Sequence, residues 1–278
     1  MTTDIKENDL PQPGRLLVCD HHTHTGFSDD CDVSADEMLA GAAAQGIKTL
    51  VVTDHYDPGY PDPEFPFQLE FEKYQEYMLK AREKYRGRME ILIGMELGIK
   101  AGQFEAANKA VNAFPYDAII GSFHCSRKSD LYTYDFSASD GPAELEDFYI
   151  YLYECLKEFD NYDILGHFSI VDRYIGKLYD YTPLTDIIDE SLKLAVQNGK
   201  GLEINTSSFK YGTGTWLPRE SILRRYRELG GEILTFGSDA HVPELYRSHF
   251  DDAVELAKHL GFRYYCIFRQ RKPEFIKL

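Results

Sequence analysis

The chain has 278 residues, of which 43% are hydrophobic, and it carries a net charge of −16 at pH 7. This length is typical of one large α/β domain, and the apolar content is sufficient for a sizeable core. The negative charge argues against a nucleic-acid surface, which requires a basic face.

Residues 1–14 are predicted to form a loose polar tail that ends at Pro13 and Gly14. This tail contains no apolar stretch typical of a signal peptide. No apolar run elsewhere approaches the roughly 18 residues of a membrane span. The five cysteines are odd in number and form no Cys-x-x-Cys pair, which favours free thiols in a reducing compartment. We therefore expect a cytoplasmic protein with no membrane partner.

The first predicted strand covers the apolar residues 16–18, and a histidine-rich stretch follows it. Side chains at i and i+2 of an extended chain point to the same face, so His22 and His24 are placed to hold one cation. Asp29 follows a glycine-containing turn and is expected to fold back to the same point. His21 would point to the opposite face, away from this cluster.

The rest of the chain alternates between predicted helices and apolar strands. A capping-box pattern at Ser34 and Glu37 begins a helix that ends near Ala44. Further helices are predicted at 68–86, 103–113, 141–159, 185–197, 219–229 and 243–260. Strands are predicted at 48–53, 90–94, 117–122, 162–165, 201–205 and 232–236, and a last apolar run at 262–268 closes the chain. This alternation predicts a mostly parallel sheet, closed or distorted into a barrel of seven or eight units.

Candidate metal ligands lie at or just after the ends of these strands, where α/β barrels carry their chemistry. They include six of the nine histidines, and they are His22, His24, Asp29, His55, Glu96, His124, His167, Asp239 and His241. Each one alone has an ordinary explanation as a loop residue, a cap or an ion-pair partner. Together they indicate a site, because seven separate segments deliver them to the same end of the fold.

Nine ligands exceed the four or five that one zinc ion takes, so the set predicts two or three divalent ions with some carboxylates bridging. Imidazole and carboxylate donors suit zinc, iron and manganese alike. Closely spaced divalent ions lower the pKa of a shared water and clamp the oxygens of a phosphoryl group. Phosphate monoesters hydrolyse very slowly by themselves, so we expect this charge neutralisation to supply most of the rate acceleration.

These motifs resemble the PHP (polymerase and histidinol phosphatase) superfamily over nearly the whole chain. The family pattern is His-x-His with a following Asp, then Thr-Asp-His, a strand-borne Glu, Gly-Ser-x-His, Gly-His and Ser-Asp-Ala-His. Here the motifs lie, in the same order, at 22–24 with Asp29, 53–55, 94–96, 121–124, 166–167 and 237–241. The resemblance implies a single domain over 1–278, folded as a distorted (β/α)7 barrel with a trinuclear metal centre.

The resemblance also implies how the ligands divide among the ions. One ion is held by His22, His24, Glu96 and Asp239, a second by Glu96, His124 and His167, and a third by Asp29, His55 and His241. By the same analogy, a metal-bridging hydroxide held by Glu96, Asp239 and His241 attacks phosphorus.

Within the superfamily, the chain length and the segments 166–174 and 202–207 resemble the histidinol-phosphate phosphatase branch. This implies hydrolysis of L-histidinol phosphate to L-histidinol and phosphate in histidine biosynthesis. Arg173 is expected to bind the phosphate through its guanidinium fork, and the alternative for it is a surface salt bridge. The branch has a glycine and an arginine where this chain has Ser208 and Lys210, and Lys210 would neutralise phosphate as a point charge.

Three other functions remain open at this stage. The same centre would also act on another phosphate ester, such as a nucleotide, a sugar phosphate or phosphotyrosine. An amidohydrolase-type barrel also begins with His-x-His, but it usually has a bridging lysine at a strand end, which these strand ends lack. A non-catalytic metal-binding module is the third alternative, and the complete ligand set argues against it.

The roles of three further polar residues also stay open. Asp54, which precedes His55, either orients a ligand imidazole or caps the loop after the strand. Asn205 is expected to face the site, and Glu203 is the alternative on the same strand. The long aromatic loop at 57–66 either covers the site or only packs against the fold.

Overall fold

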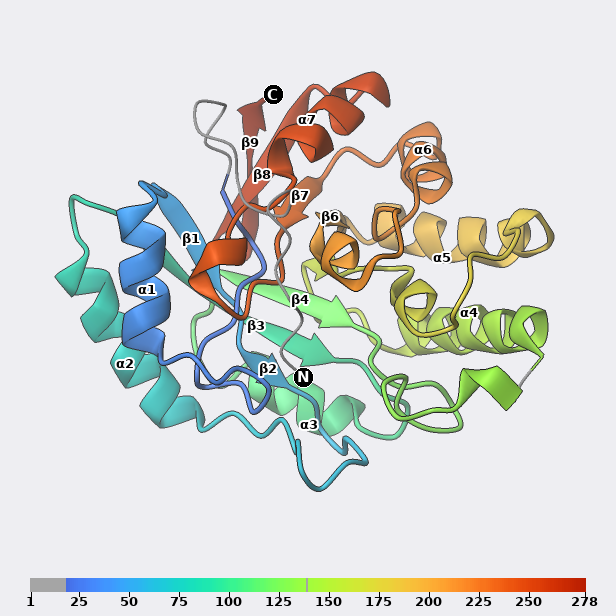
Figure 1. The fold of residues 1–278 in the computed structure, drawn as a ribbon, viewed down its shortest axis with the longest axis horizontal. Coiled ribbons are helices and arrows are strands. Elements are labelled where there is room, and N and C mark those ends of the chain that lie inside the picture. The colour runs from blue at the N-terminus through green and yellow to red at the C-terminus, as the bar shows by residue number, and fades with distance from the viewer. Residues whose placement is uncertain (1–18, 139) are drawn as a thin grey trace.

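A parallel β-sheet forms the centre of the computed structural model, which describes residues 19–138 and 140–278 (Figure 1). The predicted tail at 1–14 and the predicted strand at 16–18 lie outside the described residues. The strands pair in the order β1-β3-β4-β5-β6-β7, and β2 also pairs with β3. Their bounds are β1 Thr49–Val52, β2 His55–Tyr56, β3 Glu90–Gly98, β4 Ala118–Ser122, β5 Ile164–Leu165, β6 Gly201–Asn205 and β7 Leu234–Gly237.

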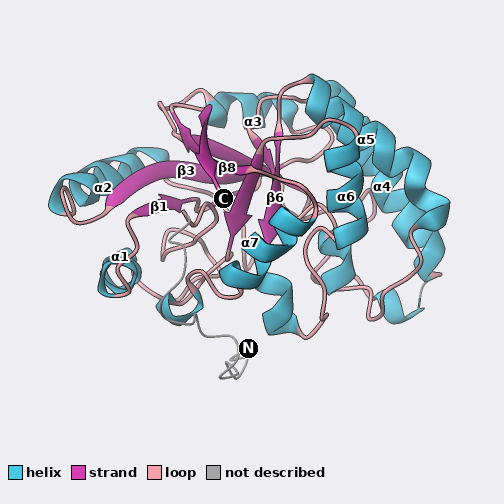
Figure 2. Ribbon diagram, turned by 90° about the horizontal axis from the view of Figure 1, so that it is seen from above, coloured by secondary structure: helices cyan, strands magenta, loops and turns pink. Residues whose placement is uncertain are grey.

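Helices lie around the outside of this sheet (Figures 1 and 2). They are α1 Ala35–Ala44, α2 Phe71–Lys84, α3 Phe104–Val111, α4 Gly141–Glu158, α5 Thr185–Gln197, α6 Glu220–Glu228 and α7 Phe250–His259. At the start of α1, the Ser34 side chain accepts from the backbone N–H of Glu37, whose carboxylate accepts from the backbone N–H of Ser34. The predicted capping box and the predicted strand–helix alternation are both confirmed.

The segment from Asp20 to His24 joins the two edges of the sheet. Asp20 pairs with Leu50 in β1, and Thr23 pairs with Ala240 just beyond β7, both in parallel. The backbone N–H of His24 also donates to the carbonyl of Ala240, with an N···O distance of 3.0 Å. The sheet therefore curls into the predicted distorted (β/α)7 barrel, with the histidine-rich segment lying between its first and last strands.

The interior is one continuous cluster of buried apolar side chains that runs from Cys19 to Phe268. In β3, every residue after Glu90 is buried, as expected for a parallel strand that is covered on both faces. All five cysteines are free and buried, as predicted. Within residues 19–138 and 140–278, the helices are too short or too polar to cross a membrane.

The chain after β7 differs from the single helix predicted over 243–260. A 3-10 turn at Pro243–Leu245 comes first, and α7 begins only at Phe250. Between them, Arg247 and His249 both adopt left-handed backbone with φ of 56°, which interrupts a right-handed helix. The backbone N–H of Arg247 donates to the buried carboxylate of Asp20 at 3.1 Å, so the chain turns toward the barrel at this point.

The last apolar run is not an additional strand of the barrel. It forms β8 (Tyr264–Arg269), which pairs antiparallel with β9 (Lys272–Lys277) as a separate hairpin. At the turn, the backbone N–H of Arg271 donates to the carbonyl of Asp117 at 2.8 Å, and its guanidinium lies 3.0 Å from the carboxylate of Asp163. These aspartates directly precede β4 and β5. The hairpin thus lies at the N-terminal ends of the strands, opposite the predicted ligands.

Candidate metal centre

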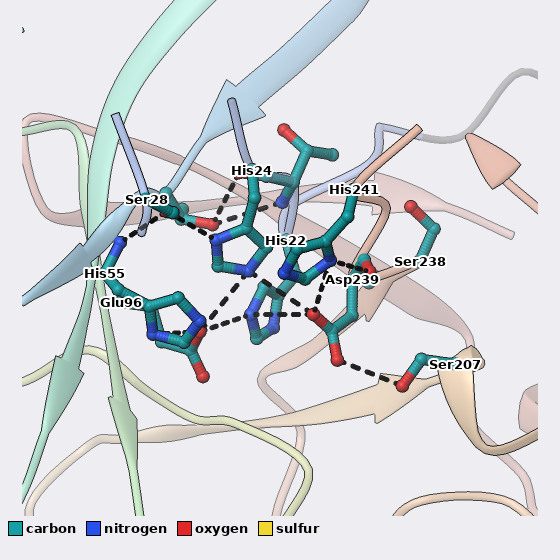
Figure 3. A network of polar contacts seen from close by, with 12 residues as sticks. His22, His24, Ser28, His55, Glu96, Ser207, Ser238, Asp239 and His241 are labelled. Carbon is teal, nitrogen blue, oxygen red and sulfur yellow. Dashed lines mark hydrogen bonds and ion pairs between the residues drawn. The ribbon is translucent and has the colours of Figure 1, made fainter. Parts of the chain in front are cut away.

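Histidine and carboxylate side chains from distant parts of the chain meet at the C-terminal ends of the strands (Figure 3). The register of the sheet explains part of this meeting, because His55 of β2 is the direct partner of Glu96 in β3. The structure brings together all the predicted metal ligands except Asp29, namely His22, His24, His55, Glu96, His124, His167, Asp239 and His241.

Glu96 occupies the middle of this cluster and is fully buried. Its Oε2 atom lies 3.0 Å from His22 Nε2 and 3.2 Å from His55 Nδ1. Its Oε1 atom lies 2.8 Å from His167 Nε2 and 3.1 Å from His124 Nε2. His24 Nε2 also lies 3.4 Å from Oε2, so the two oxygens face different sets of imidazoles, which is the arrangement that a bridging carboxylate requires.

Asp239 is the second carboxylate of the cluster, and the imidazoles of His22 and His24 lie between it and Glu96 (Figure 3). Its Oδ1 atom lies 3.3 Å from His24 Nε2, 3.7 Å from His241 Nδ1 and 3.9 Å from His22 Nε2. The backbone of Asp239 is left-handed, with φ of 54°, and its N–H donates to the carbonyl of His22 at 2.8 Å. Such strained backbone at a non-glycine residue is typical of functional sites.

Four buried nitrogen and oxygen atoms in this cluster have no hydrogen-bond partner, namely His22 Nε2, His24 Nε2, His55 Nδ1 and Glu96 Oε2. Buried polar atoms are nearly always paired, so a group of unpaired ones that face each other calls for a ligand. Four sets of three residues have ligand atoms within 4.8 Å of one another. They are His24, His55 and His241; His22, His24 and Glu96; His22, His167 and Asp239; and His55, Glu96 and His124. This donor set fits divalent ions such as zinc, iron or manganese.

The electrostatics of the cluster favour the protonation states that metal binding requires at His24 and Glu96. Burial, together with the nearby His241 and His55, lowers the pKa of His24 to about 3. Burial alone would raise the pKa of Glu96, but His22, His55 and other imidazoles hold it well below its usual value. His24 is therefore a neutral ligand and Glu96 an ionised one at neutral pH. At His22, His55 and His124, burial lowers the pKa but nearby carboxylates such as Glu96 raise it overall, so these imidazoles must release a proton when a metal binds.

The structure does not place Asp29 among the imidazoles. Its carboxylate instead accepts from the backbone N–H of Phe67, at 2.6 Å. The neighbouring Asp30 lies 3.1 Å from His241 Nε2 and 3.7 Å from His55 Nε2. Both aspartates follow the same turn, and sequence reasoning did not consider Asp30, because spacing alone cannot decide which of two adjacent carboxylates folds back.

Two carboxylates that were not predicted as ligands hold the outer nitrogens of ligand histidines. His22 Nδ1 lies 2.8 Å from Glu203 Oε1, and His124 Nδ1 lies 2.6 Å from Asp57 Oδ2. An ionised carboxylate can only accept, so each ring carries its proton on Nδ1 and directs Nε2 to the cluster. The period of two in β6 was a usable signal for Glu203, because Glu203 and Asn205 share a face.

Asp54 caps the loop and also orients a ligand imidazole, the two roles between which the sequence left the choice open. Its carboxylate accepts from the backbone N–H of Thr25 at 2.7 Å and from the hydroxyl of Ser28 at 2.8 Å. The same Ser28 hydroxyl lies 3.2 Å from His24 Nδ1. Asp54 thus orients His24 through Ser28, in addition to capping the loop. His21, as expected, points away, and its Nε2 accepts from the backbone N–H of Phe268.

Arg173 lies at the edge of the cluster, at the end of a 3-10 turn, with only 8% of its side chain exposed. Its Nη2 atom lies 3.1 Å from Asp239 Oδ2 and 2.5 Å from Ser207 Oγ. The surface salt bridge is therefore ruled out for Arg173. Lys210 is partly exposed, and its ammonium lies 5.0 Å from the ring of Tyr211, which also lies 4.4 Å from the Arg173 guanidinium.

The end of the aromatic loop packs against one ligand of the cluster. The ring centre of Phe67 lies 4.6 Å from that of His55 and 4.9 Å from that of Tyr60. Phe67 has a left-handed backbone with φ of 46°, and the N–H of Asp57 donates to its carbonyl at 3.0 Å. The loop therefore folds back on itself and shields His55.

A parallel α/β barrel with clustered imidazoles and carboxylates at the C-terminal ends of its strands defines a metal-dependent hydrolase class of protein. The comparison with known families identifies the family within this class. The model of the PHP domain matches residues 20–207, and the chain belongs to this family.

Relatives in the family cover nearly the whole chain. A Clostridium acetobutylicum protein named "Probable histidinol-phosphatase" is 30% identical over 256 residues, which are 89% of this chain and 95% of the relative. The histidinol-phosphatase of Lactococcus lactis is 27% identical over 264 residues. The crystal structure of histidinol phosphate phosphatase from Lactococcus lactis, complexed with zinc, L-histidinol and phosphate, matches with a TM-score of 0.82 and 26% identity. That match covers 94% of this chain and 100% of the other.

Proposed function

We propose that the chain is a metal-dependent histidinol-phosphatase, which hydrolyses L-histidinol phosphate to L-histidinol and phosphate. The observation that carries this proposal is the cluster of imidazoles around Glu96, in a chain similar over its length to an enzyme that binds zinc, L-histidinol and phosphate. We further infer that residues 1–278 form a single domain in the cytoplasm, since free buried thiols are typical of a reducing compartment.

Three groups of residues would hold two or three divalent ions. They are His22, His24, Glu96 and Asp239; Glu96, His124 and His167; and His55, His241 and Asp30, with Asp30 in the position predicted for Asp29. Such ions supply a hydroxide nucleophile at neutral pH and neutralise the oxygens of the phosphoryl group. Glu96, Asp239 and His241 are the residues proposed to surround that nucleophile.

The chain's own residues bind and orient the substrate. Arg173 presents a buried guanidinium beside Asp239, where its planar fork is suited to two oxygens of a phosphate. Its Nε atom is buried without a hydrogen-bond partner, so a donor is available for substrate. Lys210, which lies near the same Tyr211 ring as Arg173, adds a second positive charge at this edge of the site.

Phosphate release from L-histidinol phosphate tests the proposal directly. The protein loaded with zinc or manganese should turn over this ester with a kcat/KM at least about tenfold above that for nucleotides, sugar phosphates and phosphotyrosine. Chelation should abolish the activity, and the metal should restore it. The Asp239→Asn variant should lose it, while Asp252→Asn, at an exposed position on α7, should keep it.

Equal turnover of all these esters would contradict the assignment of L-histidinol phosphate as the substrate. It would still support a phosphatase of broader specificity. Metal-loaded protein without any phosphatase activity would contradict the enzyme itself and favour the non-catalytic module.

A further inference from the structure

Glu203 is a fully buried carboxylate on β6 that directly contacts the metal centre but has no place in the ligand sets. Three N–H groups converge on its two oxygens. His22 Nδ1 lies 2.8 Å from Oε1, while the backbone nitrogen of His167 and Nδ2 of Asn205 lie 2.8 and 3.1 Å from Oε2. Three donors around two oxygens match an ionised carboxylate, which only accepts hydrogen bonds.

Neighbouring strands leave room for this carboxylate. A Cβ atom at Gly237, in the adjacent β7, would overlap with Oε1 of Glu203 and crowd the side chain of His22. At Gly166, after β5 on the other side, a Cβ atom would approach Oε2 of Glu203 to 3.7 Å and collide with Ser122. The glycine that opens the segment leading to Asp239 is thus required because Glu203 occupies the space of its side chain.

We propose that Glu203 is a positioning residue, which fixes His22 with its proton on Nδ1 and its Nε2 lone pair directed at the metal centre, and which anchors the backbone of His167. The inference rests on the proposed function, since it assumes that this centre binds divalent ions. Histidine ligands commonly donate their second N–H to a carboxylate, which sets the tautomer and strengthens the ligand. His22 Nε2 indeed lies 3.0 Å from Glu96 and has no hydrogen-bond partner of its own.

The hydrogen bonds continue from Glu203 along the same edge to the residues proposed to bind phosphate. Asn205, whose amide nitrogen donates to Glu203, accepts through Oδ1 from the backbone N–H and the hydroxyl of Ser207, at 2.9 and 2.6 Å. The Ser207 hydroxyl in turn accepts from Arg173 Nη2 at 2.5 Å. One row of side chains therefore connects a metal ligand with the substrate arginine.

The Glu203→Gln variant tests this role, because it preserves the volume of the side chain but replaces one acceptor oxygen with an NH2 donor. In the full-length protein, the dissociation constant for zinc, measured by competition with a chelator, should rise about 10- to 100-fold. At saturating zinc, kcat for L-histidinol phosphate should fall at least tenfold, while KM changes less than threefold. Glu203→Asp retains the charge on a shorter stem and should recover part of the zinc affinity.

Glu90→Gln is the matched control, since Glu90 begins β3 at the opposite end of the barrel and pairs with Arg269. It should bind zinc as the wild type does. Zinc affinity within twofold of the wild type in both Glu203 variants would overturn the proposal, even if their metal-free melting temperatures fall, because such a result indicates a purely structural role. The zinc titrations need no substrate, so a failure of histidinol phosphate hydrolysis in the wild type would refute the proposed function separately.

Discussion

At the scale of single residues, the chemistry of the centre depends on pairing three of its imidazoles with a carboxylate on the side that faces away from the cluster. His22 has Glu203, His124 has Asp57, and His24 reaches Asp54 through Ser28. Each contact leaves one ring nitrogen free to face the cluster. The geometry is therefore set before any ion binds, which lowers the cost of ordering the ligands.

Arg173→Ala should weaken substrate binding without disturbing the metals. Losing a hydrogen bond between a guanidinium and phosphate costs about 1.5–3 kcal/mol, so kcat/KM should fall about 10- to 100-fold, mainly through KM. Steady-state kinetics with L-histidinol phosphate and metal analysis of the purified variant would check this. Arg224→Ala, an exposed arginine on α6, is the control. An unchanged KM would contradict the proposed role of Arg173 in binding the substrate.

At the scale of elements, the β8–β9 hairpin packs against the end of the barrel opposite the candidate metal centre. Arg271 at its turn contacts Asp163 at 3.0 Å and Asn161 at 2.8 Å, and the Asp163 carboxylate also accepts from the backbone N–H of Ile119. The hairpin thus connects the beginnings of β4 and β5. A substitution that breaks these contacts is therefore expected to lower the stability of the protein and to leave its activity unchanged.

Arg271→Ala should lower the free energy of unfolding by about 1–2 kcal/mol, since Arg271 is 26% exposed and its ion pair with Asp163 is only partly screened. Chemical denaturation would measure this change, and kcat/KM for L-histidinol phosphate should stay at the wild-type value. Arg224→Ala serves again as the control with unchanged stability. A large loss of activity together with normal stability would contradict the separation of the two ends of the barrel.

Buried His21 should contribute an acid-sensitive part to the stability of the metal-free protein. Burial lowers the pKa of His21 from 6.5 to about 4, so between these values the unfolded chain binds a proton that the folded chain does not. The stability contributed by neutral His21 is complete above about pH 6.5 and is lost as the pH falls toward 4, by up to about 3 kcal/mol.

Denaturation of the chelated protein at pH 7 and pH 4.5 would measure this dependence. The His21→Gln variant keeps an acceptor for the backbone N–H of Phe268 and should show a flatter dependence than the wild type. The control variant His259→Gln, at the exposed end of α7, should show the same pH dependence as the wild type. Equal slopes for His21→Gln and the wild type would show that His21 does not titrate as its burial implies.

At the scale of the whole molecule, the proposed ions connect segments from 22 to 241 of the chain. Binding to the folded state alone stabilises it by RT ln(1 + [L]/Kd), which is about 4 kcal/mol at a thousandfold excess over Kd. Chelation should therefore lower the melting temperature by several degrees, and zinc should restore it. Calorimetry of chelated and zinc-loaded protein measures the difference, and equal melting temperatures would contradict the proposed centre.

The positions of most ligands could be predicted because each follows an apolar strand, and parallel strands bring their C-terminal ends together. Asp30 and Asp57 could not be assigned in this way. They lie in turns, and the direction of a side chain in a turn depends on backbone angles that residue spacing does not determine. Glu203 carried a signal, the period of two with Asn205, but its exact contact with His22 depends on the space left by Gly237.

The fold itself followed from strand–helix alternation, and its differences from prediction have local causes. The β8–β9 turn uses Gln270 and Arg271 in left-handed backbone, without the glycine or asparagine that usually marks such a turn. The break before α7 depends on Asp20, which lies more than 200 residues away in sequence. Tertiary contacts of this range cannot be read from a local window.

The placement of residues 20–24 between β1 and β7 has a consequence for how the molecule is made. The imidazoles of His22 and His24 precede their neighbours Asp239 and His241 by more than 200 residues of sequence. A nascent chain therefore lacks part of the ligand set until both segments have been translated. Acquisition of the full complement of ions must follow the pairing of these two segments in the folded sheet.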